Sequence, residues 1–221
     1  MRQFILGAIV ILSGCVPKKD TTAENKVDTA TIEIIPRTSS PTEPQTEKVF
    51  IDFPLDSLLK FDSEVALMSA FGTNVKRSTG YYPEGMGEYP NTLLFPDSED
   101  QVEFVWLDDS VNFSGLDHIE VQGQKTTWQT SEGITLGTDL KTLEKLNQKP
   151  FTFYGFGWDY SGSVDWDGGH LFHRKVFVSL DYPGETIPSE FDGLLGDHEI
   201  RSDSELAQKA NPVVREITMR R

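Results

Sequence analysis

The stretch Val102-Glu-Phe-Val-Trp-Leu107 decides the class of fold, because from Val102 its apolar side chains recur at every second position. A second stretch, Val176-Phe-Val-Ser-Leu180, repeats the same alternation further along the chain. Successive side chains of a β-strand point to opposite faces of the sheet, so each stretch would present one apolar face. This period of two predicts an antiparallel sheet that is covered on one side.

Two short helices are predicted ahead of these strands. Asp62 and Ser63 are suitable N-caps for a helix that Gly72 would end, since glycine readily adopts the left-handed conformation found after helices. Thr138-Asp139 would cap a second helix, with its leucines on one face and its end at Asn147. We therefore expect an α+β fold, a largely antiparallel sheet packed by two or three short helices.

The chain end is predicted to be a strand of the same sheet. Val213, Ile217 and Met219 alternate with Arg215 and Thr218, as the side chains of a half-buried strand do. We expect its removal to expose a sheet edge and core side chains.

The two halves of the domain resemble each other in their order of motifs. Phe71-Gly-Thr-Asn-Val75 corresponds to Leu146-Asn-Gln-Lys-Pro150, and Trp106-Leu-Asp108 corresponds to Ser179-Leu-Asp181 at a similar offset. Two tandem helix–hairpin units are one interpretation of this regularity. The other is a chance likeness between two segments that each place a helix before a hairpin.

The sequence Gly133-Ile-Thr-Leu-Gly-Thr-Asp-Leu-Lys-Thr-Leu-Glu-Lys-Leu-Asn147, followed by an aromatic strand, resembles the opening of a known module. That module combines a helix with an antiparallel sheet in β-lactamase inhibitor protein and in a lipoprotein of the barrel-assembly machinery. The resemblance covers about a third of the chain and lacks the usual pair of consecutive helices. It implies a binding module and transfers no functional residue.

The N-terminus resembles a bacterial lipoprotein signal. A positively charged N-terminal segment precedes an apolar run that begins at Phe4 and ends in Leu12-Ser-Gly-Cys15. The run is about half as long as the ~20 residues that a membrane-spanning helix needs. Residues 1–14 are therefore predicted to be a cleaved signal peptide. The resemblance implies that Cys15 is acylated and binds membrane lipid, and several acyl chains give stable anchoring.

The anchor predicts a cell-envelope location. Val16 stands where an acidic residue would favour the inner membrane in enterobacteria, so the outer membrane is favoured, and the periplasmic or surface side stays open. Residues 15–48 are rich in Thr and Pro and are predicted to be a disordered tether, with Ile32–Ile35 as a candidate short strand. Residues 49–221 would then form a single globular domain, long enough for a core.

The charge and the cysteine content exclude several classes of function. The net charge of −15 would repel phosphate backbones, so a nucleic-acid partner is not expected. The lipoprotein resemblance implies that the single cysteine carries the lipid, which would leave neither a disulfide nor a thiol nucleophile. The usual hydrolase, metalloprotease and P-loop motifs are absent from the sequence, and we expect no cofactor.

The segment from Gly155 to His170 is the densest in glycine, aromatic and acidic residues, and it is the candidate binding site. A partner surface, stacking on sugar rings and plain core packing are the open interpretations of its aromatic residues. The candidate binding residues are Trp158, Asp159, Tyr160, Asp165, Trp166 and Asp167. Among the tryptophans, Trp166 is expected to be exposed in a loop and Trp158 to lie nearer a strand.

Three other chemistries fit this segment less well. Gly155 and Gly157 begin a dinucleotide-binding pattern, but Tyr160 stands where its third glycine is needed. A nonstandard calcium site would lack the further acidic ligands of an EF-hand loop. His170 and His173 are expected on opposite faces of a strand, so no shared metal is predicted.

These observations favour a non-enzymatic binding or assembly module of the envelope, with an envelope protein as its unidentified partner. The alternative is a hydrolase or glycan-binding protein that acts on envelope polymers. A glycosidase needs two carboxylates that the fold brings together, and sequence spacing does not identify such a pair.

Overall fold

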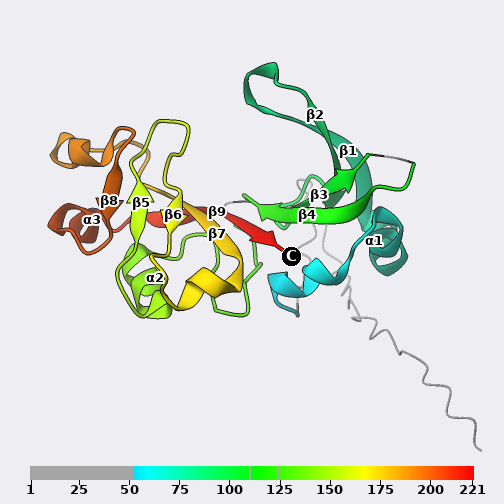
Figure 1. Cartoon of the computed structure of the whole chain (residues 1–221), viewed down its shortest axis with the longest axis horizontal. Helices are drawn as coiled ribbons and strands as arrows, with labels where there is room; N and C mark the ends of the chain where they lie inside the picture. The colour runs from blue at the N-terminus through cyan, green and yellow to red at the C-terminus, as the bar shows by residue number, and fades with distance from the viewer. Residues whose placement is uncertain (1–51, 110, 124) are drawn as a thin grey trace, which may run out of the picture. The chain divides into compact units, whose positions relative to one another are not determined.

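Six antiparallel strands form the main sheet of the computed structural model, which describes residues 52–109, 111–123 and 125–221 (Figure 1). In spatial order they are β1 (Val75–Tyr81), β2 (Glu88–Leu94), β3 (Val102–Asp108), β4 (Ser114–Val121), β9 (Val213–Arg220) and β7 (Val176–Asp181). A smaller sheet consists of β6 (Val164–Asp165), β5 (Thr152–Tyr154) and β8 (Glu199–Arg201). The α+β prediction with a largely antiparallel sheet is confirmed.

Both predicted helices are present with the predicted N-caps. The Ser63 hydroxyl accepts a hydrogen bond from the Ala66 backbone N–H at 3.4 Å, and Asp139 accepts one from Thr142 at 2.9 Å. Gly72 ends the first helix with a φ of 57°. The α-helices are α1 (Glu64–Phe71), α2 (Leu140–Asn147) and α3 (Glu205–Ala210). Short 3₁₀ helices are η1 (Leu55–Lys60), η2 (Gly72–Asn74), η3 (Pro83–Gly85), η4 (His170–Arg174) and η5 (Ser189–Leu194).

The apolar faces predicted for β3 and β7 are buried in one core. Phe104 from β3 and Leu180 from β7 have no exposed surface, and neither does Trp128 in the loop that follows β4. Full burial of one such side chain stabilises the fold by about 1.5–3 kcal/mol. The alternation of apolar side chains along β3 and β7 therefore identifies residues of the core.

The predicted second hairpin does not form, so the two halves are not equivalent. In the first half β2 pairs with β3, whereas in the second half β5 pairs with β6 and β8 while β7 pairs with β9. The intervening segment packs on β7 through Gly162, whose carbonyl accepts a hydrogen bond from the Leu180 N–H at 2.8 Å. A β-carbon at Gly162 would lie 1.9 Å from the Leu180 carbonyl oxygen, so only glycine permits this approach.

The C-terminal strand is confirmed, and β9 lies between β4 and β7. Ile217 and Met219 are buried as predicted, but Val214 is buried in place of Val213. The pairing of β9 with β7 shifts register between Ser179 and Leu180, which changes the face that the first residues of β9 present.

An ion pair between the buried Glu64 and the exposed Arg77, which the sequence did not reveal, joins α1 to the main sheet. Glu64 is 2% exposed and accepts hydrogen bonds from the Arg77 Nε at 2.8 Å and the Thr92 hydroxyl at 3.0 Å. The Trp106 indole N–H in turn donates to the Thr92 hydroxyl at 2.9 Å. The buried polar groups of this network all have partners, as burial in a low-dielectric interior requires.

The predictions for the N-terminal region lie outside the described residues. They concern the signal peptide (1–14), Cys15, the tether (15–48) and the candidate strand Ile32–Ile35. Within the described part of the chain, the helices are too short or too polar to cross a membrane.

Candidate functional site

Two aromatic side chains project into solvent from the loop that joins β5 to β6. Trp158 is 63% exposed and Tyr160 is 62% exposed, and Asp159 between them is also exposed. The Tyr160 ring leans on Tyr154 of β5, with the two centroids 5.6 Å apart. This loop contains three of the six predicted binding residues and presents them together.

The backbone of this loop is fixed by hydrogen bonds. The Ser161 N–H donates to the Trp158 carbonyl at 2.9 Å, and the Gly157 N–H donates to the Ser161 hydroxyl at 3.0 Å. Arg215 of β9 donates to the Ser161 carbonyl at 3.3 Å. Together with the packing of Gly162 on β7, these bonds hold the loop backbone in place before any partner arrives. Binding then costs less ordering entropy.

A second loop is hydrogen-bonded to the start of the first and carries another exposed apolar side chain. Phe156 forms an isolated bridge with Leu195, and the Gly196 N–H donates to the Phe156 carbonyl at 3.1 Å. Leu195 is 43% exposed. We call Trp158, Tyr160 and Leu195 the aromatic loop surface. Tyrosine and tryptophan, which form two of its three members, are among the residue types enriched at the cores of protein interfaces.

The structure corrects the expected exposure of Trp166, because Trp166 is 4% exposed and belongs to the core. Its indole N–H donates to the Val176 carbonyl at 2.8 Å, and its ring packs edge-on against Phe151 with centroids 5.3 Å apart. Trp166 directly follows β6, which places it over the core, whereas Trp158 lies in the turn. The prediction was therefore wrong about which tryptophan is exposed, since Trp158 is exposed and Trp166 is buried.

Asp165 and Asp167 shape the turn after β6 and lie apart from the aromatic loop surface in the chain. Asp165 accepts a hydrogen bond from the Asp167 N–H at 2.8 Å, and Asp167 accepts one from the Thr152 hydroxyl at 2.9 Å. A search of residues 52–221, apart from the two undescribed positions, finds no group of three or more His, Cys, Asp or Glu side chains placed to hold a metal ion. The calcium interpretation has no support from this geometry.

The two histidines lie in η4 and not in a strand. His170 lies 3.5 Å from the Glu132 carboxylate, which also pairs with Arg174 at 3.0 Å. His173 is exposed and packs edge-on against Phe172, with ring centroids 5.1 Å apart. Both histidines are thus accounted for by surface contacts.

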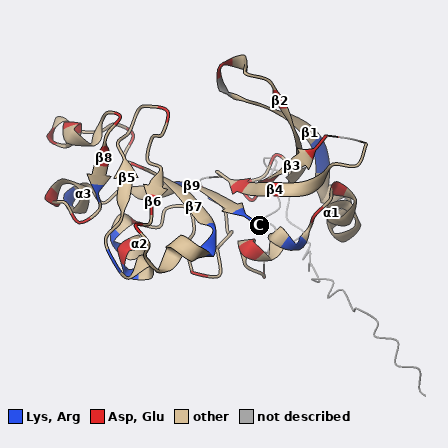
Figure 2. Cartoon of the chain, in the orientation of Figure 1, with Lys and Arg blue, Asp and Glu red and all other residues tan. Residues whose placement is uncertain are grey.

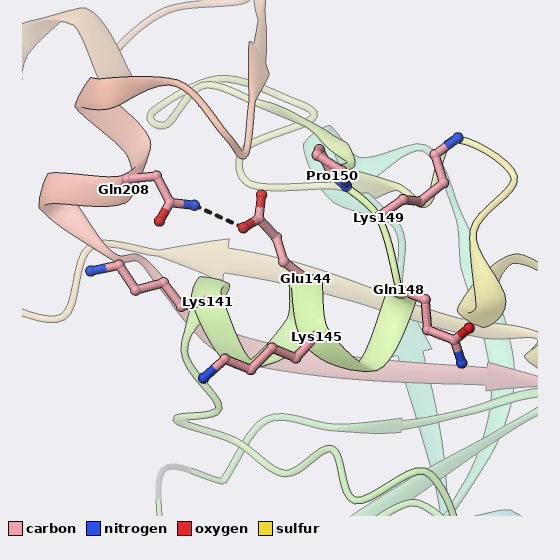
Figure 3. A pocket seen from close by; sticks show the side chains of 7 residues that line it. All are labelled: Lys141, Glu144, Lys145, Gln148, Lys149, Pro150 and Gln208. Atoms are coloured by element: carbon pink, nitrogen blue, oxygen red, sulfur yellow. Dashed lines mark hydrogen bonds between the residues drawn. The ribbon is translucent and has the colours of Figure 1, made fainter.

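A groove of about 560 Å³ runs along α2 and is lined by lysines and amides (Figure 3). Its one carboxylate, Glu144, accepts hydrogen bonds from Gln208 at 2.9 Å and from Ser202 at 2.5 Å. The amino group of Lys149 turns away from the other lysines and donates to the Asp167 carbonyl. A second groove of about 370 Å³ also has a single carboxylate, Asp52, in its lining. Neither groove offers the pair of carboxylates that a glycosidase uses.

Comparison with known proteins adds little to this geometry. No protein-family model matches the chain, and no curated protein matches it. A solved structure, that of the uncharacterized protein yfeY from Escherichia coli, aligns over 72% of this chain and 88% of that chain. The sequence identity is 13% and the TM-score is 0.37, a likeness too low to support an argument about this protein.

Proposed function

We propose that this protein is a lipid-anchored binding or assembly module of the bacterial envelope, whose aromatic loop surface docks on an envelope protein. The observation that carries the proposal is the exposure of Trp158 and Tyr160 on a loop with a hydrogen-bonded backbone. Aromatic anchors of this kind contribute most of the binding energy at protein interfaces. The anchor at Cys15 would keep the module at the membrane where its partner resides.

Crosslinked capture from native envelopes tests the proposal. The full-length protein and its Trp158→Ala variant are compared, and Phe172→Ala is the matched control because Phe172 is 55% exposed on a different element. Loss of a hot-spot tryptophan costs about 2 kcal/mol or more, or roughly 30-fold in affinity. We expect one crosslinked protein to be lost from Trp158→Ala and retained by Phe172→Ala. Equal capture by all three proteins would refute the role of the loop.

The anchor is tested separately by lipid labelling. Cys15→Ala should abolish incorporation of labelled palmitate and leave the uncleaved precursor, because the thiol is the acylated group. Unchanged labelling would disprove the lipoprotein assignment without affecting the test of the loop.

A further inference from the structure

Three glutamates gather on the face of the main sheet opposite the core. Glu103 of β3 lies directly across from Glu120 of β4, and Glu120 lies across from Thr218, two residues from Glu216 on β9. All three side chains are partly exposed, and acidic residues mark β4 in Figure 2. Like charges directly opposite each other in a sheet destabilise it, so the arrangement calls for a compensating group.

The described residues supply no cation to this group. None of the ion pairs found in the described ranges involves Glu103, Glu120 or Glu216. On the same face, Arg220 lies over the Phe177 ring, with 5.6 Å between the guanidinium carbon and the ring centroid. The contacts that do reach the three carboxylates come from two side-chain amides and from the Tyr89 hydroxyl on β2, which carry no net charge.

One side-chain amide bridges two of the carboxylates, and a second amide contacts the third. The Gln122 amide nitrogen donates to Glu120 and also to Glu216, the latter at 3.3 Å. The Asn91 amide nitrogen donates to Glu103 at 2.6 Å. We call Asn91, Glu103, Glu120 and Glu216 the acceptor cluster.

The oxygen of the Asn91 amide is an independent sign that a donor is missing. Asn91 is 4% exposed, and its Oδ1 is buried without a hydrogen-bond partner. A buried acceptor without a donor is costly and is seldom left so in a folded protein. Because the Asn91 amide nitrogen donates to Glu103, the unsatisfied oxygen of the same amide group lies next to the cluster. A donor that bridges the amide oxygen and the carboxylates would satisfy both.

The electrostatics of the site agree with the geometry. Burial, followed by the charges of Glu216 and Glu103, raises the pKa of Glu120 to about 7. Burial, the charge of Glu103 and a hydrogen bond to Glu103 raise the pKa of Tyr89 on β2 to about 12. His118 also faces this side from β4, and it pairs with Asp117 at 2.7 Å. The site therefore has a negative potential that favours a bound cation.

We infer that the acceptor cluster binds the guanidinium group of an arginine side chain from a partner protein. A guanidinium carries five donors in one rigid plane and pairs bidentately with carboxylates, so one group can serve several acceptors on neighbouring strands. A metal ion is disfavoured, because the described residues contain no group of three or more His, Cys, Asp or Glu side chains placed to hold one. The site lies on the six-stranded sheet and does not depend on the aromatic loop surface.

Titration of the full-length protein with a triarginine peptide tests the inference. We expect binding at about pH 7.5 that weakens at least tenfold in Glu103→Gln and in Glu120→Gln. Glu199→Gln is the matched control, since Glu199 is an exposed strand glutamate of the smaller sheet, and it should bind as the unchanged protein does.

A readout at the site separates specific binding from general attraction to an acidic protein. On binding, the Asn91 side-chain amide resonance should shift and the apparent pKa of Glu120 should fall, because the bound cation favours the charged carboxylate. Equal affinity of the Glu120→Gln and Glu199→Gln variants would overturn the inference. So would failure to bind the peptide, or tight binding of Ca²⁺ alone that the same substitutions abolish.

Discussion

Replacing Glu120 with Gln should stabilise the domain, and the gain should grow as the pH rises. In the folded protein the pKa of Glu120 is raised from 4.5 to about 7 by burial and by the neighbouring glutamates. Below about pH 4.5 the carboxyl is protonated in both the folded and the unfolded state, so it does not lower the stability. As the pH rises toward 7, ionisation is available to the unfolded chain but opposed in the folded one, so stability falls.

The magnitude follows from the size of this pKa difference. At about 1.4 kcal/mol per pH unit, the rise corresponds to about 3 kcal/mol of lost stability once the group is ionised in both states. Glu120 is partly exposed, so solvent screening reduces this value, and we expect a gain of about 1–3 kcal/mol at pH 8. Glutamine has the shape of the protonated acid and removes the pH-dependent cost.

Urea unfolding of both proteins at about pH 5 and pH 8 provides the assay, with Glu199→Gln as the control. In thermal unfolding of the same proteins, a gain of 1 kcal/mol should raise the melting temperature by about 2–4 °C for a domain of this size. The gain from Glu120→Gln should be much larger at the higher pH. An equal change at the two pH values would show that Glu120 has an ordinary pKa and that the three carboxylates do not interact.

Three further predictions concern the core and the loop. Trp166→Ala should cost about 3–5 kcal/mol of stability in thermal unfolding because the ring is buried, whereas Trp158→Ala should change the melting temperature little; the reverse order would contradict the positions of the two rings. Arg77→Met should lower stability by about 1–3 kcal/mol in chemical unfolding, because it leaves the Glu64 carboxylate buried with only neutral donors. Gly162→Ala should destabilise the domain and reduce partner capture as Trp158→Ala does, because the new methyl group would collide with strand β7 and displace the loop. Unchanged unfolding and unchanged capture would show that this contact does not fix the loop.

Local physics explains why the strands and helices could be predicted from the sequence. The alternation in β3 and β7 depends on the period of a strand, and the caps Ser63 and Asp139 act on backbone groups three residues away. Both signals lie within one short stretch of chain. The partner of β5 could not be predicted in the same way, because it depends on Gly162 meeting β7 and on β8 being supplied from a distant part of the chain.

Trp158 and Trp166 show where composition stops being informative. Both tryptophans stand next to aspartate and close to glycine, so their local sequences do not separate an exposed ring from a buried one. The separation comes from Val176, whose carbonyl accepts the Trp166 indole hydrogen bond, a contact between two elements ten positions apart. An aromatic residue within a glycine-rich segment is thus a candidate for recognition only after its packing is known.

The acceptor cluster could not be predicted from the sequence at all. Its members lie on four strands, and their contact depends on the register that sets Glu103 against Glu120 and on the position of β9 beside β4. A slip of one residue in either pairing would turn one glutamate toward the core and separate the charges. The register is held by buried side chains on the opposite face, such as Phe104 and Ile119, which are partners in the same pair of strands. The packing that stabilises the sheet therefore also forces the carboxylates together, and the site persists because the core does not permit the strands to slide apart.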